Sequence, residues 1–564
     1  MSEQIRSGRY RPRGMGGDRS LASLVPAVRL GRMRDGGPGW PAPAAATLAS
    51  LRVRPGLLLA AGVVLAFAFA LAIRALFLGT AYDVFVDEVT YFLISQAVAT
   101  GHGVVLHGKP FFLHPPLFFL AEAPYILLSH PSGLLLQQVL DMRQFDAVLG
   151  TLTAVVLLLV AGRVGGWRVG IVAYLLFALD PFIVRINSRN LIESFALLLV
   201  MLGYLALLWG PVERGRIGRG RLLAVGLCFG AALLSKEMTA FLTLLPIGIL
   251  FLTDWVLPRR AALGIIVVAA LVYAVYPAGV LLSGLGPLFV TEKLSGLLRF
   301  LGVVKTTGFV HGGPSFTAAI VGNLDVFATT YVLIALGVPA ALLLAWKGDP
   351  KRRVIGVLGV SAYALLAYSI GFGTLEEQFF YFLVLPAILG VPLAWSYVVR
   401  LERRIRTSGS ILGSRADLAA MAHRAVAIGG AILPVALAVS LGWSSFVWLQ
   451  VRLSHDDGYR QVEAYLRSHV PQGTRIGVTT EPQEFILQGY VIEPIQSAPA
   501  IVSTRVRYVV ISTKQIEAGY TPNGRAIWAW LRGRGQPVYT FSGRTYGSIE
   551  VYRVPAGSAS TPRG

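Results

Sequence analysis

The feature that most constrains this chain is a series of long apolar runs separated by short polar loops. Crossing the hydrocarbon core of a membrane as a helix takes about 20 mostly apolar residues, and by that measure the sequence predicts about eleven membrane-spanning helices. We therefore expect an all-α, multi-pass membrane protein. The expected spans begin near Gly56, Phe145, Val169, Leu191, Leu222, Thr239, Ala261, Val326, Val354, Phe379 and Ala425.

The composition agrees with a membrane protein. Only 14% of the residues are charged, whereas soluble domains carry about 25%. The net charge of +21 could suggest a nucleic-acid partner, but the basic residues concentrate in an N-terminal tail and in short loops. Basic faces interleaved with aromatic residues, which are typical of nucleic-acid binders, are missing, so no nucleic-acid partner is expected. The single cysteine, Cys228, excludes a disulfide within the chain and a cysteine-rich metal site.

The basic loops predict the orientation of the chain. Clusters of Arg and Lys between the predicted spans fall on the same side as the basic tail, and the positive-inside rule places that side in the cytoplasm. We expect residues 1–54 to be a disordered cytoplasmic tail and residues 55–451 to be a domain in the plasma membrane. An odd number of spans then makes residues 452–564 extracytoplasmic. The clusters are Arg163 and Arg168, Arg214–Arg221, Arg259 and Arg260, Lys347–Arg353, and the run from Arg400.

The last part of the chain has a different pattern. Four short runs rich in β-branched and aromatic residues occupy residues 475–480, 508–513, 537–543 and 548–554. Helical patterns at residues 458–470 and 524–535 lie before and between them. This alternation predicts a small α/β domain. Its role is open between positioning an acceptor and stabilising the outer loops.

Three carboxylates lie directly after the first predicted span, in the stretch YDVFVDEVTYFL. If the stretch is helical, Asp83 and Asp87 lie one turn apart on one face, with Tyr91 on the next turn. Ionisable groups beside a membrane core are functional more often than not, which favours a general base over a solvated loop that only ends the helix. Asp87 and Glu88 are the candidate catalytic residues, and Asp83 is a supporting one.

The same loop resembles a known family. The stretches VDEVTYFLISQAVATGHG and GKPFFLHPPLFFL are similar to the first outer loop of the GT-C glycosyltransferases, and most similar to the protein O-mannosyltransferases and the lipid A aminoarabinose transferase. The resemblance implies a GT-C fold, with Asp87 as the general base and Tyr91 as a contact to the donor phosphate. His114 stands where the aminoarabinose transferase has a Lys. It is either a phosphate ligand or a loop histidine.

Two further stretches carry candidate phosphate ligands. In RINSRNLIESF, Arg189 and Glu193 either form an ion pair with each other or, as the resemblance implies, bind and orient a lipid-linked phosphate. In LLSKEMTAFLTLLP, Lys236 either neutralises phosphate or extends its ammonium to the membrane surface.

The later part of the membrane domain adds weaker candidates. Tyr381, in GTLEEQFFYFLVLPA, is either part of a motif near the lipid carrier or part of an interfacial aromatic belt. The long second outer loop, from about Gly284 to Asp325, is expected to lie on the membrane surface and to be partly helical. It supplies Lys293, Arg299 and Lys305 as candidates for stabilising a leaving group. No cofactor is expected and no metal cluster stands out, although a divalent ion on Asp87 or Glu88 is left open.

The resemblance implies the transfer of a sugar, such as mannose or a similar hexose, from a polyprenyl-phosphate carrier within the membrane lipid. The acceptor would be a hydroxyl on an extracytoplasmic protein, glycan or lipid, and a single displacement would invert the anomeric configuration. The alternatives are a transporter or flippase of lipid-linked or free sugars and a catalytically silent scaffold. A transporter is less favoured because no internal repeat is evident and the charged groups gather at one surface.

Overall fold

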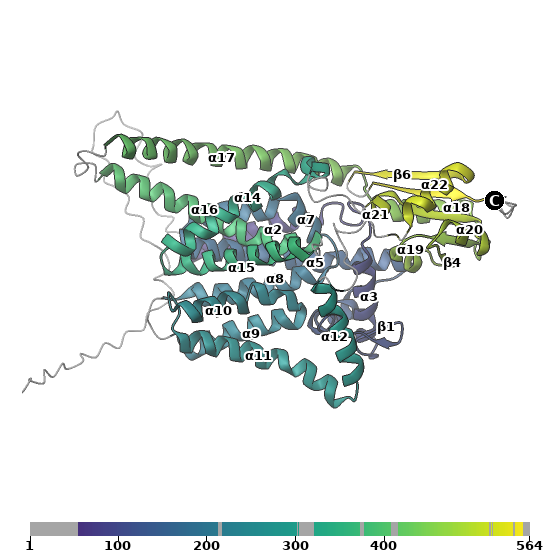
Figure 1. The fold of residues 1–564 in the computed structure, drawn as a ribbon, viewed down its shortest axis with the longest axis horizontal. Helices are drawn as coiled ribbons and strands as arrows, with labels where there is room; N and C mark the ends of the chain where they lie inside the picture. The colour runs from purple at the N-terminus through teal and green to yellow at the C-terminus, as the bar shows by residue number, and fades with distance from the viewer. Residues whose placement is uncertain are drawn as a thin grey trace, which may run out of the picture. The chain divides into compact units, whose positions relative to one another are not determined.

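The structure is a computed structural model of the whole chain (Figure 1). It describes residues 55–212, 217–301, 303, 321–372, 377–407, 416–517, 521, 523–544 and 547–555. The predicted tail, residues 1–54, lies outside the described residues. By internal contacts the chain divides into the units Met1–Ala68 and Phe69–Gly564. Of the first unit the structure describes residues 55–68, which form most of helix α2 (Pro55–Ala75).

Each of the eleven predicted spans coincides with a helix among the described residues. Seven segments there are long and apolar enough to cross a membrane, namely α5, α8, α11, α14, α15, α16 and the stretch from Ile432 that ends α17. Helices α2, α6, α9 and α10 have shorter apolar stretches. The bounds are α5 Leu135–Gly165, α6 Trp167–Leu179, α8 Ile192–Trp209, α9 Arg219–Ser235, α10 Leu244–Thr253, α11 Arg259–Leu282, α14 Leu324–Lys347, α15 Pro350–Phe372, α16 Glu377–Thr407 and α17 Ala416–Leu453. The chain is thus a mostly helical multi-pass membrane protein.

Helix α5 begins ten residues before the predicted start at Phe145. Its first turns contain the polar residues Gln137, Gln138, Asp141 and Arg143. These residues lower the local hydropathy, so the apolar pattern does not indicate where the helix begins. Arg143 therefore lies inside a helix. This shift places a buried arginine within the helix bundle.

The two long loops are partly helical. The first contains α3 (Val86–Ala99), the antiparallel pair β1 (Val105–Leu106) and β2 (Lys109–Pro110), and α4 (Leu117–Ser129). The second contains α12 (Gly286–Phe300), as expected for a surface segment. Short helices occupy two of the turns between longer ones, α7 (Pro181–Ile186) before α8 and the 3-10 helix η2 (Glu237–Phe241) before α10.

The C-terminal part is a small α/β domain with a five-stranded sheet in the order β4-β3-β5-β7-β6. Strands β4, β3 and β5 are parallel, and β7 and β6 continue the sheet antiparallel. The four predicted strands and both predicted helices are present, and β4 is an edge strand that the sequence pattern missed. The bounds are α18 Gly458–His469, β3 Arg475–Val478, α19 Glu481–Ile486, β4 Val491–Pro494, α20 Ala498–Ser503, β5 Tyr508–Ser512, α21 Thr513–Glu517, α22 Gly524–Arg534, β6 Gln536–Gly543 and β7 Gly547–Arg553.

The two faces of this sheet bury different cores. Alternate residues of β5 point to opposite faces. Val509 and Ile511 pack in a cluster with α22, whereas Val510 belongs to a second cluster. That second cluster joins the α/β domain to the first loop. Its members from α18 are Tyr459, Val462 and Leu466, at the spacing of one helix face, and its members from α3 and α5 include Val89, Phe92, Val139 and Met142.

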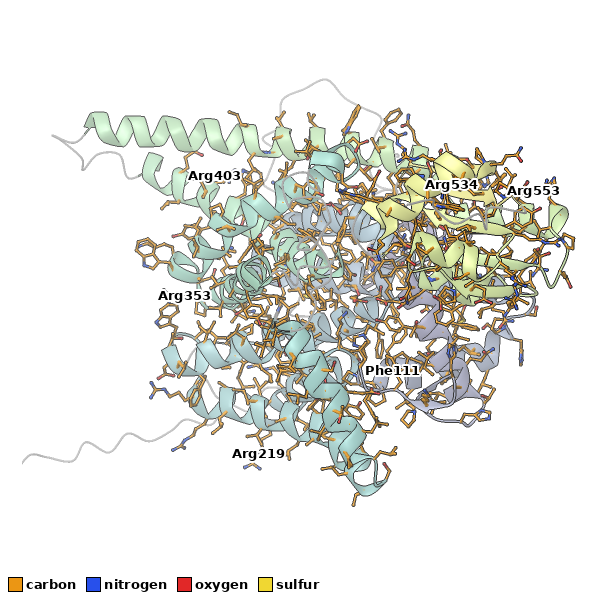
Figure 2. All side chains as sticks on the ribbon, turned by 45° about the vertical axis from the view of Figure 1, so that its right-hand side comes forward. Phe111, Arg219, Arg353, Arg403, Arg534 and Arg553 are labelled. Atoms are coloured by element: carbon orange, nitrogen blue, oxygen red, sulfur yellow. The ribbon has the colours of Figure 1, made fainter. Side chains whose placement is uncertain are left out.

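The α/β domain therefore packs directly on the loop that carries the candidate catalytic residues, at one end of the helices (Figure 1). Arg219, Arg353 and Arg403 lie at the other end of the helices, away from Arg534 and Arg553 of the α/β domain (Figure 2).

Candidate active site

The segment 76–85, between α2 and α3, is held through its backbone carbonyls by buried arginines. Arg143 of α5 donates to the carbonyls of Leu78 (3.3 Å), Tyr82 (3.0 Å) and Asp83 (3.1 Å). Arg452, near the end of α17, donates to the carbonyl of Leu76 at 2.9 Å. A buried backbone carbonyl needs a donor when water is excluded, and a guanidinium can serve several at once. The segment is therefore fixed on the helices that surround it.

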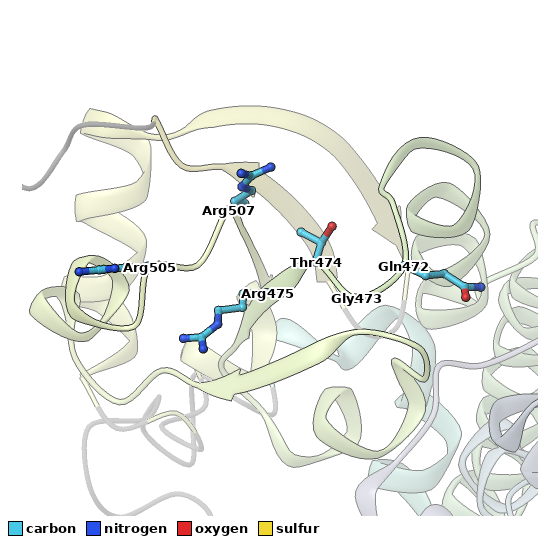
Figure 3. Close-up of a pocket in the computed structure, with 6 residues that line it drawn as sticks. All are labelled: Gln472, Gly473, Thr474, Arg475, Arg505 and Arg507. Carbon is cyan, nitrogen blue, oxygen red and sulfur yellow. The ribbon is translucent and has the colours of Figure 1, made fainter.

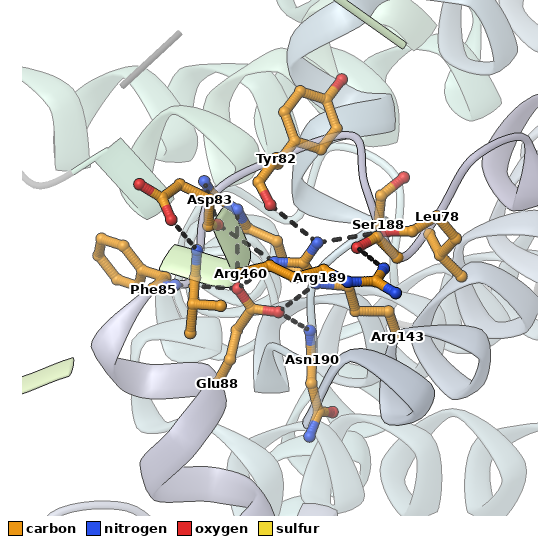
Figure 4. A network of polar contacts seen from close by, with 12 residues as sticks. Leu78, Tyr82, Asp83, Phe85, Glu88, Arg143, Ser188, Arg189, Asn190 and Arg460 are labelled. Carbon is orange, nitrogen blue, oxygen red and sulfur yellow. Dashed lines mark hydrogen bonds and ion pairs between the residues drawn. The ribbon is translucent and has the colours of Figure 1, made fainter. Parts of the chain in front are cut away.

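Glu88 is the acidic centre of this arrangement (Figure 4). Its carboxylate accepts hydrogen bonds from Arg143 Nε (2.8 Å) and Nη2 (3.1 Å), and both side chains are 0% exposed. The backbone N–H groups of Phe85 (3.0 Å) and Asn190 (3.2 Å) donate to the same two oxygens. These four donors occupy the lone-pair positions that a carboxylate offers. Glu88 also closes the first turn of α3, because Phe85 is the N-cap residue of that helix.

Arg189 is brought to the same cluster from the turn before α8. It donates to the carbonyl of Asp83 at 3.2 Å, and its Nε lies 3.8 Å from Oε1 of Glu88. Its guanidinium also lies over the rings of Tyr82 and Phe85. The structure thus gathers Glu88, Arg143 and Arg189 around one loop.

The expectation that Arg189 and Glu193 lie on one face of a helix is wrong. Helix α8 begins at Ile192, so Arg189 precedes the helix and does not share a face with Glu193. Glu193 is paired with Lys236, the residue that directly follows α9. Lys236 is 3% exposed, so the alternative of a lysine that extends to the membrane surface is also wrong.

Asp87 and Asp83 have different positions. Asp87 lies half-buried in the first turn of α3, one turn before Tyr91. Asp83 precedes the helix, so the two carboxylates are not stacked on one helix face as expected. Asp83 Oδ1 accepts the N–H groups of Val84 (2.9 Å) and of Tyr459 in the α/β domain (3.1 Å). Burial raises the pKa of Asp83 to about 7, against the opposing effect of these two donors and of Arg189.

A second group of candidates meets beside α3. The Tyr91 hydroxyl and His114 Nε2 are 3.2 Å apart. Lys293 of α12 pairs with Glu237 at 2.5 Å and reaches the carbonyl of Leu113 at 3.4 Å. The structure thus places Lys293 of α12 and Glu237 of η2 close to Leu113, the neighbour of His114 in sequence. Arg299 lies in α12 with its side chain outside the described residues, and Lys305 lies outside them altogether.

Tyr381 is buried within the helices. Its side chain is 0% exposed, and its hydroxyl accepts a hydrogen bond of 2.7 Å from Asn187 Nδ2. The interpretation as part of an interfacial aromatic belt is therefore wrong, because belt residues face lipid headgroups. Asn187 follows α7 and accepts two hydrogen bonds from Arg74 of α2.

The sequence reasoning missed three buried arginines, Arg74, Arg143 and Arg452. Arg452 also donates to Ser188 Oγ at 2.5 Å, next to Arg189 in sequence. Each stands within or beside an apolar run, and a lone ionisable residue in such a run is a functional signal by default. That signal was present in the sequence. Among the described residues, no group of three or more His, Cys, Asp or Glu side chains could hold a metal ion.

The comparisons with known proteins concern the fold and the family of the chain. Residues 64–282, which include Asp87, Arg189 and Lys236, match the family model described as dolichyl-phosphate-mannose-protein mannosyltransferase. The structure is similar to that of ArnT from Cupriavidus metallidurans bound to undecaprenyl phosphate, with a TM-score of 0.52 and 14% identity over 88% of this chain and 98% of that one. The chain has the GT-C glycosyltransferase fold.

A second solved structure extends the likeness of the GT-C fold. The oligosaccharyltransferase of Archaeoglobus fulgidus in the apo form has a TM-score of 0.50 and 12% identity, over 88% of this chain and 74% of that one. No curated protein sequence matched the chain. The recognition of the fold from the first loop is therefore confirmed, whereas the roles of the individual site residues stay predictions.

Proposed function

We propose that the chain is a glycosyltransferase that uses a polyprenyl-phosphate-linked sugar, mannose or a similar hexose, as its donor. The acceptor is a hydroxyl group of a protein, a glycan or a lipid. The GT-C fold, the match to a mannosyltransferase family and a similar structure that binds undecaprenyl phosphate support this proposal. The observation that carries it is the cluster at segment 76–85, where Glu88 pairs with Arg143 and Arg189 and is preceded along the chain by Asp87, a half-buried carboxylate in the same helix turn.

Asp87 is the general base of the reaction. Its neighbour Glu88 already receives four hydrogen bonds, so the base lies at the carboxylate that is partly exposed. Asp87 accepts the proton of the acceptor hydroxyl while the oxygen attacks the anomeric carbon. The bond between that carbon and the phosphate oxygen breaks, and polyprenyl phosphate leaves. A single displacement of this kind inverts the anomeric configuration.

Glu88 acts as a positioning residue. It holds Arg143 and its Oε1 lies 3.8 Å from Nε of Arg189, so it orients guanidinium groups from the helix turn that also carries Asp87. A planar guanidinium suits a phosphate because its donors form a fork. Arg189 and Lys236 stabilise the negative charge that develops on the leaving phosphate. Tyr91 and His114 form hydrogen bonds to that phosphate, and Lys293 is a further cation beside it.

The proposed orientation follows from the arginine distribution. The ends of the helices that carry Arg219, Arg353 and Arg403 lie away from the α/β domain (Figure 2). The positive-inside rule places these residues in the cytoplasm. The α/β domain and the segment 76–85 are then extracytoplasmic, where a water-borne acceptor meets a donor whose lipid tail stays in the bilayer.

Replacing Asp87 with Asn tests the proposal. The full chain is placed in lipid nanodiscs with radiolabelled polyprenyl-phosphate-mannose and a cell-envelope extract as the source of acceptors. Release of the label from the lipid phase should fall by roughly 10²–10⁴-fold, while binding of the donor is retained. Asp141→Asn is the control, because this carboxylate lies in α5 and accepts a hydrogen bond from Gln137 at 2.8 Å.

Two results would contradict the assignment. Full turnover in the Asp87→Asn variant would place the base at another residue. If the wild-type chain moved the labelled donor between the leaflets of a proteoliposome without breaking the sugar–phosphate bond, a transporter would replace the transferase.

A further inference from the structure

A cavity of about 340 Å³ lies in the α/β domain, away from the cluster described above (Figure 3). It is found where β3 and β5 begin, because Arg475 is the first residue of β3 and Arg507 directly precedes β5. The opposite end of β3 leads to Thr480, which contacts Tyr459 and through it Asp83. The cavity and the candidate catalytic loop therefore lie at opposite ends of the same strand. Its lining residues are Gln472, Gly473, Thr474, Arg475, Arg505 and Arg507.

The charge of this cavity is strongly positive. Three of its six lining residues are arginines, and all three are exposed. One carboxylate is close by, Glu493, which lies 3.6 Å from Arg475. Within the described residues, the side chains of Arg505 and Arg507 have no hydrogen bond or ion pair. Two guanidinium groups are thus available for a ligand.

The backbone also favours a binding role. Arg505 has φ of +54°, in the left-handed region that a residue with a long side chain rarely adopts. The turn that contains it joins α20 to β5 and is tied to β3 by a hydrogen bond of 3.1 Å from Arg507 N–H to the Arg475 carbonyl. A sparsely populated conformation persists when the surrounding structure holds it, and it marks functional positions more often than others. The backbone that carries Arg505 and Arg507 is therefore held in a fixed conformation.

We propose that this cavity binds the carboxylate or phosphate groups of an acidic glycan. Guanidinium forks pair with both kinds of oxyanion in a bidentate manner. The remaining lining residues, Gln472, Gly473 and Thr474, offer polar groups for sugar hydroxyls. Peptide-binding surfaces use apolar pockets and aromatic anchors, and the cavity has neither among its lining residues, which favours a glycan over an acidic peptide.

Binding of an acidic glycan at this cavity would make that glycan the acceptor of the transfer reaction, so this inference rests on the proposed function. A strand of four residues separates the cavity from the side of the domain that contacts Asp83, a length of about 13 Å at 3.3 Å per residue. An acceptor that reaches both places must be a chain of several sugars. Its acidic groups would be held at the cavity while a hydroxyl further along meets Asp87.

The test measures binding and transfer separately. The full chain in nanodiscs is titrated with polygalacturonate as the carboxylate probe, a phosphorylated mannan as the phosphate probe, neutral dextran, and polyglutamate as an acidic peptide. The variant carries Arg505→Gln and Arg507→Gln. The control carries Arg525→Gln and Arg532→Gln, which removes the same charge from exposed positions of α22.

We expect wild-type binding of at least one acidic glycan that weakens with salt, and about a tenfold loss of affinity in the Arg505/Arg507 variant only. In the transfer assay the same variant should raise KM for an acidic acceptor without a matching fall in kcat. The two probes show which oxyanion is preferred.

Several results would overturn the inference. These are equal losses in the variant and the control, no wild-type binding of either acidic glycan, dextran binding of the same strength, or polyglutamate binding with the same dependence on Arg505 and Arg507. An unchanged KM for acidic acceptors would remove the acceptor role. Glycan binding without any transfer would instead refute the proposed function and leave the binding site in place.

Discussion

The buried pair of Glu88 and Arg143 allows a quantitative test of the clamp on segment 76–85. In Glu88→Gln the guanidinium stays buried without its counter-charge, which costs about 3–5 kcal/mol. Arg143→Met leaves the carbonyls of Leu78, Tyr82 and Asp83 without this donor, and an unsatisfied buried polar group costs about 1–3 kcal/mol. Arg143→Met also leaves the buried carboxylate of Glu88 without this partner, so each single variant should lose at least about 3–5 kcal/mol of unfolding free energy.

The double variant should lose less than the sum of the two single losses, because the second substitution removes a charge that has already lost its partner. We expect a coupling energy of at least about 2 kcal/mol. The assay is unfolding by SDS in mixed micelles, followed by tryptophan fluorescence. The control pair is Glu463 and Arg467 on α18, whose arginine is 31% exposed and whose coupling should stay below about 1 kcal/mol. A coupling energy for Glu88 and Arg143 as small as that of the control pair would refute the reasoning.

Two further perturbations can be read from the same assay. Because burial raises the pKa of Asp83 from 3.8 to about 7, the folded state keeps a proton that the unfolded chain releases, so the unfolding free energy falls as pH rises from about 4 to 7. The Asp83→Asn variant keeps an oxygen acceptor and has no carboxylate to ionise, so its unfolding free energy should exceed that of the wild type by up to about 4 kcal/mol at pH 8. The difference should be smaller at pH 5. Equal differences at the two pH values would contradict this reasoning. Tyr381→Phe removes the acceptor of Asn187 Nδ2 and should cost about 1–2 kcal/mol, whereas a change below about 0.5 kcal/mol would show that Ser194 suffices as a partner.

The sequence predicted the helices well because the signal for a membrane span is strong and local. Each expected span coincides with a helix, since a long apolar run has few other stable conformations in a membrane. The start of α5 was missed because its first turns contain Gln, Asp and Arg and so lack a continuous apolar run. In the α/β domain β4 was missed because a run of four residues that includes Glu493 and Pro494 has no clear alternation.

The pairings among the candidate site residues could not be predicted from the sequence. Arg189 and Glu193 are four apart in sequence, yet the helix starts between them, and a helix start is uncertain by a few residues. The partner of Glu193 is Lys236, 43 residues further along the chain. The partner of Glu88 is Arg143, 55 residues away. Such pairings depend on how helices pack, which no local pattern encodes.

The core that joins the first loop to the α/β domain has a consequence for biosynthesis. The hydrogen bond from the backbone N–H of Tyr459 to the carboxylate of Asp83 spans 376 residues of sequence. While the ribosome is still producing the intervening helices, α18 does not yet exist, and the α3 residues of this core lack the partners that the α/β domain supplies. The loop that carries Asp87 can thus reach its final form only after nearly the whole chain has been made and inserted. A prematurely terminated chain would expose that surface to chaperones and proteases, and a half-made molecule would be inactive.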